Sequence, residues 1–215
     1  MPSTKIDIPN GHSMLKPHNL NIHENRHDAK FYDTMATIMS LRQTYMNDRF
    51  IFVKGKDMVP ILKGLGARDT DFELLKSISD QTSPDPTLDY RAASLGCYCI
   101  DFEARDIRRL EQQPYTLTVQ EDYKRHDSAI RRIFAEVPTD MQENTVVQAL
   151  MIFMALVFQD VPITPRDQLD YSSQSWVCMI FNGRIVTDIS KGIFGEPALE
   201  GVHSDGIGSH DVSSI

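Results

Sequence analysis

Apolar side chains recur at helical spacing in three stretches of the chain. From Asp28 to Tyr45 they return every three or four residues, which predicts an amphipathic helix. Thr70-Asp-Phe-Glu73 has the form of a capping box and predicts the start of a second helix. Thr139-Asp-Met-Gln142 has the same form, so we expect a third helix to begin there and to run to about Phe158.

The third predicted helix contains the longest apolar run of the chain, the ten residues from Ala149 to Phe158. A membrane-spanning helix needs about 20 apolar residues, so this run predicts a buried core helix instead. We expect it to pack across the outside of a sheet. Its predicted inward side chains follow the i, i+3, i+4, i+7 spacing and are Leu150, Phe153, Met154 and Val157.

Short stretches rich in β-branched and aromatic residues predict strands elsewhere in the chain. The segment 175–188 is expected to form one strand or a hairpin bent at Asn182-Gly183. Ser83-Pro-Asp-Pro86 predicts a turn or loop, and so does the glycine-rich stretch from Gly192 to Pro197. The other predicted strands are 49–53, 90–102, 114–119 and 199–203.

This order of elements predicts an α+β fold, with helices early and a β-rich second half. Residues 1–27 are rich in Asn, His, Pro and Gly without a hydrophobic period, and we expect an irregular leader there. Residues 28–215 are then a single domain, because 215 residues make one large domain more readily than two small ones.

The net charge of the chain disfavours some classes of binding partner. Thirty acidic and 22 basic side chains leave a formal net charge of -8, which disfavours nucleic acid and anionic membranes and leaves a small molecule as the expected ligand. Three cysteines form no closed disulfide framework, and the N-terminus lacks the apolar core of a signal sequence. We therefore expect a cytoplasmic protein. The sequence leaves its oligomeric state open.

Cysteines and arginines form clusters for which structural roles are favoured. Cys97 and Cys99 share one face of a predicted strand, and only Cys178 could add a third thiol, so we expect buried, inert cysteines rather than a zinc site. The Arg-rich stretches 105–109 and 131–132 lack interleaved aromatic residues on one face. They predict solvated faces or ion-pair partners.

His23-Glu-Asn-Arg-His27 has the HExxH pattern of zinc peptidases, in which two histidines on one helix face hold the metal. Its flanks are too polar for a buried metal-binding helix, and only 22 residues precede it. We therefore interpret this segment as a solvated helix N-terminus.

A second candidate metal site is Glu200-Gly-Val-His203-Ser-Asp205-Gly206. Residues two apart on a strand point to the same side, so the imidazole of His203 and the carboxylate of Asp205 could reach one metal ion. Such a pair supplies two ligands of the facial triad of non-haem Fe(II) oxygenases. The pattern alone is common by chance, and an ordinary turn is the alternative.

The surroundings of this pair strengthen the metal interpretation. From Trp176 onward the chain has a predicted strand with Arg184-Ile185 near its end, then Gly195-Glu-Pro197, then Glu200 to Gly206. This stretch resembles the 2-oxoglutarate/Fe(II) dioxygenase family that includes bacterial L-isoleucine 4-hydroxylase. Weaker similarities occur upstream in the family's order: Pro84-Asp-Pro86 with Tyr90-Arg91, Gln113-Pro-Tyr115, and Ile130-Arg-Arg-Ile-Phe134.

The resemblance implies Fe(II) bound by His203 and Asp205, 2-oxoglutarate as co-substrate, and hydroxylation of an aliphatic C–H of a free amino acid or similar small molecule. It also implies a double-stranded β-helix, the jelly-roll or cupin-like fold, with flanking N-terminal helices. Arg184 and Glu200 could orient the ligands or bind substrate, and a structural ion pair is an equal alternative for each.

The family supplies a second histidine and a basic anchor for 2-oxoglutarate well downstream of the His-x-Asp pair. Only ten residues follow Asp205 here, and His210 is too close in sequence to return from a neighbouring strand. We therefore expect a partial β-helix, in a C-terminally truncated member of the family that does not reach the turnover of a complete relative. The alternative is a non-catalytic scaffold or interaction protein that retains half of the fold.

Overall fold

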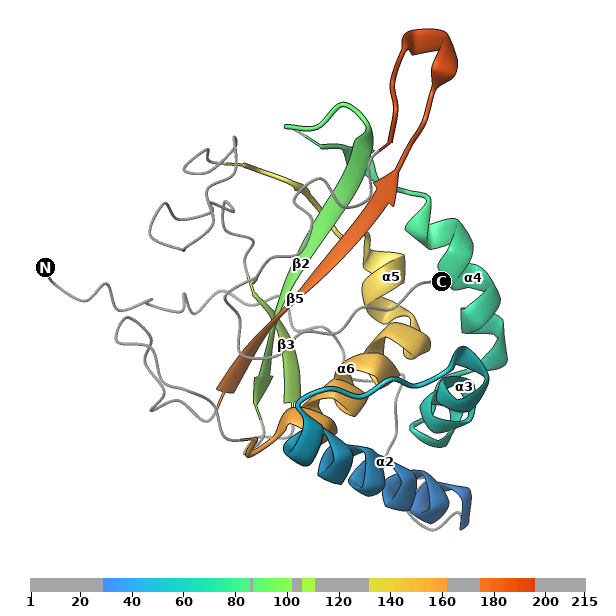
Figure 1. Ribbon diagram of the computed structural model, residues 1–215, viewed down its shortest axis with the longest axis vertical. Helices are drawn as coiled ribbons and strands as arrows, with labels where there is room; N and C mark the ends of the chain where they lie inside the picture. Colours follow the sequence, from blue (N-terminus) through green and yellow to red (C-terminus); the bar gives the residue numbers. More distant parts are fainter. Residues whose placement is uncertain (1–28, 86, 102–105, 111–131, 162–174, 196–215) are drawn as a thin grey trace, which may run out of the picture.

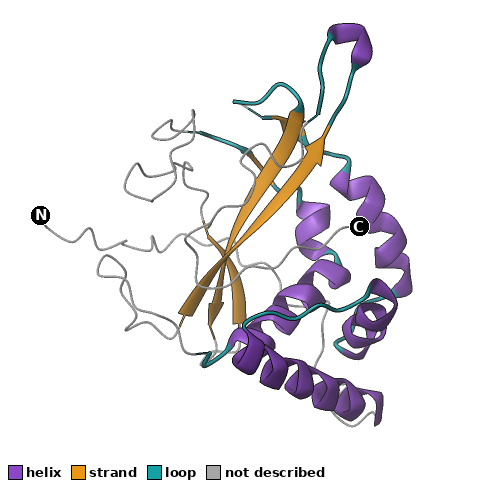
Figure 2. Ribbon diagram, viewed as in Figure 1, coloured by secondary structure: helices purple, strands orange, loops and turns teal. Residues whose placement is uncertain are grey.

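The computed structural model describes residues 29–85, 87–101, 106–110, 132–161 and 175–195. Figure 1 shows all helices of this part of the chain on one side of a sheet, except a short one at the tip of a projecting hairpin, and Figure 2 separates helices and strands by colour. The helices are α2 (Ala29–Asp48), α3 (Gly55–Gly64), α4 (Asp69–Ser79), α5 (Thr139–Glu143), α6 (Thr145–Phe158) and the short 3-10 helix η1 (Ile189–Lys191). The strands are β1 (Ser83–Pro84), β2 (Arg91–Asp101), β3 (Asp106–Leu110), β4 (Ala135–Glu136) and β5 (Ser175–Ile185).

β2 is the central strand of the sheet. β5 pairs with it antiparallel over all eleven residues, while β1, β4 and β3 share its other edge. Because β2 offers an unbroken partner, β5 does not bend at Asn182 and Gly183, which lie opposite Ser94 and Ala93. The single predicted strand is therefore confirmed and the hairpin alternative is wrong. The predicted strand 90–102 is confirmed as β2, whereas the predicted loop at 83–86 contains the two-residue strand β1.

Successive residues of β2 point to opposite faces of the sheet. Tyr98 is fully buried on the face toward the helices and belongs to the same core cluster as residues of those helices. Ala93 and Leu95 lie on the opposite face, where they form a second buried cluster with Phe134. The main core thus lies between helices and sheet, and a smaller apolar cluster lies on the far side of the sheet.

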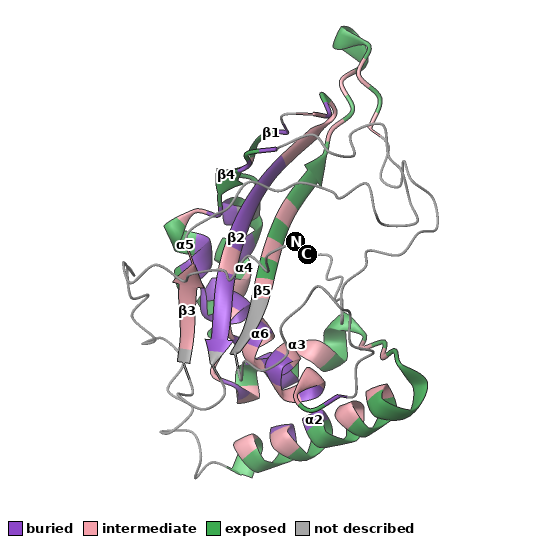
Figure 3. Cartoon of the chain, turned by 90° about the vertical axis from the view of Figure 1, so that its left-hand side faces the viewer, coloured by how far each residue is buried: buried purple, intermediate pink, exposed green. Residues whose placement is uncertain are grey.

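The apolar helix α6 is covered from several directions. It packs against α2, α3 and α4 and shares the main core cluster with Tyr98, and Figure 3 shows it among the buried parts of the chain. Phe153 and Val157 are buried as predicted, but Leu150 and Met154 are only half-buried. A single inward stripe therefore does not describe this helix, because helices as well as the sheet surround it.

The helix starts differ from the predicted capping boxes. α4 begins after Arg68 and α5 after Pro138, and neither start has a side-chain cap. The predicted third helix is two helices, because Asn144 leaves the helical conformation and caps α6. Its Oδ1 accepts hydrogen bonds from the backbone N–H of Val146 at 2.9 Å and of Val147 at 3.4 Å. Both predicted capping boxes are therefore wrong, although helices form at both places.

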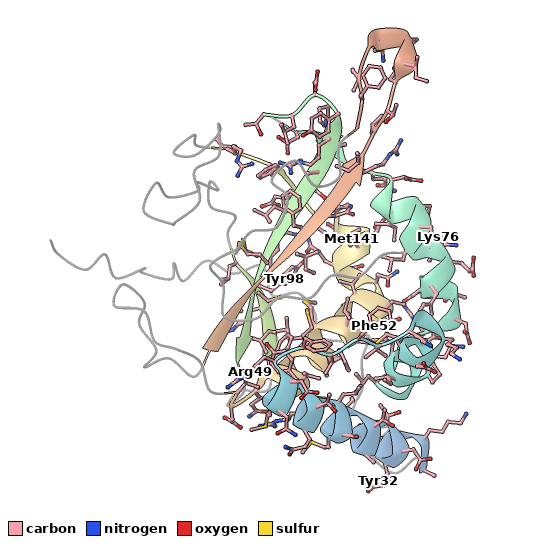
Figure 4. The ribbon with its side chains drawn as sticks, in the orientation of Figure 1. Tyr32, Arg49, Phe52, Lys76, Tyr98 and Met141 are labelled. Atoms are coloured by element: carbon pink, nitrogen blue, oxygen red, sulfur yellow. The ribbon has the colours of Figure 1, made fainter. Side chains whose placement is uncertain are left out.

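The strand predicted at 49–53 is wrong. No strand of the described residues pairs with this segment, and the helix α3 begins at Gly55, two residues after the predicted strand. Ile51 and Val53 pack against the main core, while Phe50 and Phe52 point outward and are mostly exposed. Figure 4 shows Phe52 on the connection between α2 and α3. Alternating burial thus arises here from an extended connection rather than from a sheet.

The α+β class is confirmed, and the described strands form one sheet. The double-stranded β-helix stays a prediction. No helix in the described ranges combines the length and the apolar character needed to cross a membrane. Several predicted segments lie outside the described residues: the irregular leader 1–27 with the HExxH segment, and the strands 114–119 and 199–203.

Candidate functional site

The predicted metal ligands His203 and Asp205, together with Glu200, lie outside the described residues. Among the residues that are described, no three His, Cys, Asp or Glu side chains come together as a metal site. The three cysteines do not converge either: Cys178 lies opposite Tyr98 on the helix side, while Cys97 and Cys99 belong to the other face of β2. Within this part of the chain, a shared thiolate site is therefore ruled out.

A hairpin follows β5 and precedes the His-x-Asp segment in the sequence. Asp188 and Ile193 pair across it, and Figure 1 shows it projecting beyond the ends of β2 and β5. Asp188 Oδ1 accepts hydrogen bonds from the amide of Ser190 at 3.1 Å and from its hydroxyl at 2.6 Å. These bonds, with those from Lys191, hold the pKa of Asp188 below its usual 3.8. Gly192 closes the turn in the left-handed conformation, with φ of 69°.

The hairpin returns the chain to the end of β5. The amide of Gly195 donates a 3.0 Å hydrogen bond to Thr187 Oγ1, just after the last residue of β5. The loop predicted around Gly192 and Gly195 is confirmed for these two residues. Gly195 is the last described residue, and the Glu200 to Gly206 segment follows it closely in the sequence.

Arg184 is part of an ion pair on the helix side of the sheet. Arg184 is a residue of β5 and lies opposite Ala92 of β2. Its Nη1 is 3.2 Å from Oδ1 of Asp80, at the end of α4. Both side chains are well exposed, so the pair contributes little to stability. The sequence left open whether Arg184 contacts a ligand or forms a structural ion pair, and the structure shows an ion pair.

The sheet face turned away from the helices, which we call the distal face, is apolar and partly uncovered. Register places alternate residues of the two long strands on it: Arg91, Ala93, Leu95, Cys97 and Cys99 of β2, and Met179, Phe181, Gly183 and Ile185 of β5. Met179, Phe181 and Ile185 are 40–49% exposed. Large apolar side chains with that exposure, side by side on one strand, are typical of surfaces that contact a ligand or another segment.

An ion pair between a partly exposed arginine and a buried carboxylate lies at one end of the distal face. The Nε of Arg91 donates a 2.6 Å hydrogen bond to Oδ2 of Asp85, whose side chain is fully buried. Asp85 Oδ1 accepts from the amide and the hydroxyl of Thr87, at 2.8 and 2.7 Å, and from the amide of Leu88. Burial by itself would raise the pKa of Asp85, but these hydrogen bonds and the charge of Arg91 outweigh it, so the pKa is lowered.

Two phenylalanines and two arginines form a continuous stack on the distal face. The guanidinium of Arg91 lies 5.5 Å from the ring centre of Phe181. Phe181 meets Phe134 edge-to-face at 5.3 Å, and the guanidinium of Arg132 lies 5.6 Å from the ring centre of Phe134. Arg132 is buried, so the solvated face predicted for residues 131–132 is wrong for this residue. Its spacing two residues before Phe134 was the sequence signal for a shared face.

The ion-pair alternative for the other Arg-rich stretch holds for Arg109, which contacts Glu136 at 2.5 Å. The cluster of Arg91, Asp85, Phe134 and Phe181 was not predicted as a site. Apart from β5, its residues lie in the segments that show only weak upstream similarity to the family. The sequence does not indicate a site there, because the three separate segments come together only in the folded sheet.

Comparisons with known proteins agree on one family. A family profile described as 2OG-Fe dioxygenase matches residues 76–212. The bifunctional enzyme flvA of Aspergillus flavus is 48% identical over 190 residues, which are 88% of this chain and 23% of flvA. The solved structure of the Fe(II)/(alpha)ketoglutarate-dependent dioxygenase TqaL, labelled with selenomethionine, is 40% identical, with a TM-score of 0.67.

The similarity to TqaL covers 84% of this chain and 57% of TqaL, so the chain spans little more than half the length of that protein and about a quarter of flvA. Fe(II) and 2-oxoglutarate are the metal and co-substrate of these dioxygenases. The profile match over most of the chain, together with the identity to TqaL, leads to one conclusion: the chain belongs to the 2OG-Fe dioxygenase family.

Proposed function

We propose that this chain carries the Fe(II)-binding part of a 2-oxoglutarate-dependent hydroxylase that acts on an aliphatic C–H of a free amino acid or a similar small molecule. The observation that carries the proposal is the His203-Ser-Asp205 pair inside the matched region 76–212. An imidazole nitrogen and a carboxylate oxygen suit Fe(II), which binds two histidines and one carboxylate in this class of site. Bound Fe(II) with 2-oxoglutarate would supply the oxidation of the C–H bond.

The described residues support this proposal through the surface of β5, the strand that precedes the His-x-Asp segment in the sequence. The hairpin ending at Gly195 brings the chain back to β5, whose residues Met179, Phe181 and Ile185 are partly uncovered on the distal face. An apolar surface of this kind excludes water from a reacting C–H bond and contacts aliphatic substrate atoms. The role of this chain's own residues is to hold and orient the ligands and to exclude water.

Metal analysis tests the proposal with a matched pair of histidine variants. The purified chain is loaded with Fe(II) without oxygen, in the presence of 2-oxoglutarate, and bound iron is measured after gel filtration. We expect His203→Ala and Asp205→Ala to lose iron, because each removes one of the two identified ligands. His23→Ala, which removes a histidine of the HExxH segment, is expected to keep it.

The same samples distinguish the alternatives. Zinc lost on His23→Ala would favour a zinc site at the HExxH segment. No bound metal in the wild-type chain would favour the non-catalytic scaffold. If iron binds, succinate formed from 2-oxoglutarate with a panel of free amino acids tests the substrate class. Succinate that stays at the level without amino acid for every member would contradict that class.

A further inference from the structure

Arg91 is a partly accessible cation on the distal face to which the proposed reaction assigns no role. Its side chain is 16% exposed, although its Nε is bound to the fully buried carboxylate of Asp85. Among the residues that the structure describes, Asp85 is its hydrogen-bond acceptor and Phe181 its aromatic neighbour. A cation in this position is held in place and still has access to a ligand.

The hydrogen bonds of Asp85 leave one edge of the guanidinium available. A guanidinium has five N–H donors in a planar fork, and Asp85 takes the one on Nε. The second oxygen of Asp85 is occupied by Thr87 and Leu88. The pair of donors on the two Nη atoms therefore remains for another acceptor, and that pair matches the two oxygens of a carboxylate.

The fixed orientation of Arg91 favours binding. A mobile arginine loses rotamer freedom when it binds a ligand, and this loss subtracts from the affinity. Here the buried Asp85 on one side and the ring of Phe181 on the other restrain the guanidinium before any ligand arrives. Asp85 offsets part of the positive charge, so the recognition we expect depends on the geometry of the fork as well as on charge.

The neighbours of Arg91 suit an aliphatic group. Ile185 lies directly opposite Arg91 in the pairing of β2 and β5. Phe181 is on the same face of β5, and its ring is next to the guanidinium of Arg91. Both side chains are more than a third exposed. A ligand that matches both features carries a carboxylate at one end and an apolar portion beside it.

We propose that Arg91 binds the carboxylate of a small aliphatic acid, with Phe181 and Ile185 in contact with its apolar portion. Asp85 is a positioning residue, which orients the guanidinium without contacting the ligand. The inference rests on the proposed function, in which two such acids are present, the amino-acid substrate and 2-oxoglutarate. The carboxylate chemistry is common to both, and the experiment separates them.

The test measures binding to the whole 215-residue chain by isothermal titration calorimetry. The acid probes are L-isoleucine and 2-oxoglutarate, and L-isoleucinamide is the control that lacks the carboxylate. We expect the wild-type chain to prefer L-isoleucine or 2-oxoglutarate over the amide. Arg91→Gln should weaken binding of the preferred acid about ten- to hundredfold, the usual effect of losing a charge-assisted hydrogen bond, and leave the amide unchanged.

Arg109→Gln is the matched control. Arg109 is 17% exposed, is bound to Glu136 and lies opposite Tyr98, away from the distal face, so the same change of charge there should leave both affinities unchanged. Asp85→Asn should lower the preference for acid over amide while Arg91 keeps its charge. A purely structural role of Asp85 would lower the melting temperature and leave that preference intact.

Some outcomes of this experiment assign Arg91 to one of the two acids, and others overturn the inference. A loss confined to L-isoleucine assigns Arg91 to the substrate, and a loss confined to 2-oxoglutarate assigns it to the co-substrate. Equal binding of acid and amide, no binding of either acid, or an unchanged affinity in Arg91→Gln overturns the inference. If Arg91→Gln does not fold, Arg91→Lys replaces it, because lysine keeps the charge but lacks the planar guanidinium. An unchanged preference for acid over amide in Arg91→Lys also overturns the inference. Failure of the proposed function is a separate result, seen as iron that His203→Ala does not remove.

Discussion

The carboxylate of Asp71, in the first turn of α4, caps the first turn of α6 through Thr145, which lies 74 residues away in the sequence. The amide of Thr145 donates to Asp71 Oδ2 at 2.9 Å, and the hydroxyl of Thr145 donates to the same oxygen. Arg68 donates to it as well, at 3.0 Å, and Asn144 donates from its side chain to the backbone carbonyl of Asp71 at 2.9 Å. These bonds join the early helices to the long apolar helix.

Asp71→Ala is expected to lower the free energy of unfolding by about 2–3 kcal/mol, because the buried donors of Thr145 lose their acceptor. Thr70→Ala is the control. The sequence alone predicts a cap at Thr70, but within the described part of the chain its hydroxyl donates only to the Asp71 side chain, at 3.4 Å, so we expect a change below about 0.5 kcal/mol. Urea unfolding of both variants measures the difference. A larger loss for Thr70→Ala than for Asp71→Ala would restore the predicted capping box.

Asp85 should make the protein sensitive to acid. Burial by itself would raise its pKa, but the hydrogen bonds from Thr87 and Arg91 and the charge of Arg91 outweigh that effect, and the net result is a pKa below 3.8. A carboxylate with a lowered folded-state pKa contributes its full stability above the unfolded-state pKa and loses it as the pH falls through the folded-state value. We therefore expect Asp85→Asn to lose less stability than the wild type between about pH 5 and pH 3.

Urea unfolding at the two pH values measures this difference. Asp57→Asn, at an exposed carboxyl in the first turn of α3, is the control and should follow the wild-type pH dependence. The same slope in wild type and Asp85→Asn would show that Asp85 contributes nothing to acid unfolding.

Asn144 should be the residue that separates α5 from α6. Asn144→Ala removes the acceptor for the amides of Val146 and Val147 and is expected to cost about 1–2 kcal/mol. Thr139→Ala, at an exposed position in the first turn of α5, should change the stability by less than about 0.5 kcal/mol. Thermal or urea unfolding compares them. Equal effects would mean that the cap does not stabilise α6.

Phe134 and Phe181 should be energetically coupled across the distal face. Their edge-to-face contact at 5.3 Å predicts a coupling of about 0.5–1.5 kcal/mol in a double-mutant cycle of Phe134→Leu and Phe181→Leu. Phe153 is the control partner, because it lies in the main core with α6. Phe134→Leu and Phe153→Leu should be additive within about 0.5 kcal/mol. Additivity in the first cycle would contradict the stack.

Tyr98 should tolerate the loss of its hydroxyl. Burial raises the pKa of Tyr98 to about 12, so the group is protonated, and its oxygen has no hydrogen-bond partner among the described residues. Tyr98→Phe is expected to leave the free energy of unfolding unchanged or to raise it by up to about 1 kcal/mol. Tyr98→Leu, which removes the ring that packs over Gly96, should cost about 2 kcal/mol or more. A loss above about 1 kcal/mol in Tyr98→Phe would reveal a partner for the hydroxyl.

Local patterns were sufficient to predict several elements. The helix over 29–48 follows from the spacing of Phe31, Met35, Ile38 and Leu41, whose side chains are all at least partly buried. The strand β5 follows from its run of β-branched and aromatic residues, and the α+β class follows from the order of the predicted helices and strands. These features depend on which residues lie a few positions apart, and the sequence contains that directly. The sequence also carries the His203-Ser-Asp205 motif, the basis of the metal prediction.

Other features depend on contacts between distant segments, and only the tertiary structure decided them. The residues 49–53 have the composition of a strand but lack a partner strand among the described residues, so they form a connection. The cap of α6 uses Asn144 and the remote Asp71 rather than the capping-box residues. Arg91 and Phe181 meet because β5 pairs with β2 in one register, and shifting that register by one residue would turn Phe181 to the helix side. Backbone pairing and burial between distant segments set these positions, and no local spacing specifies them.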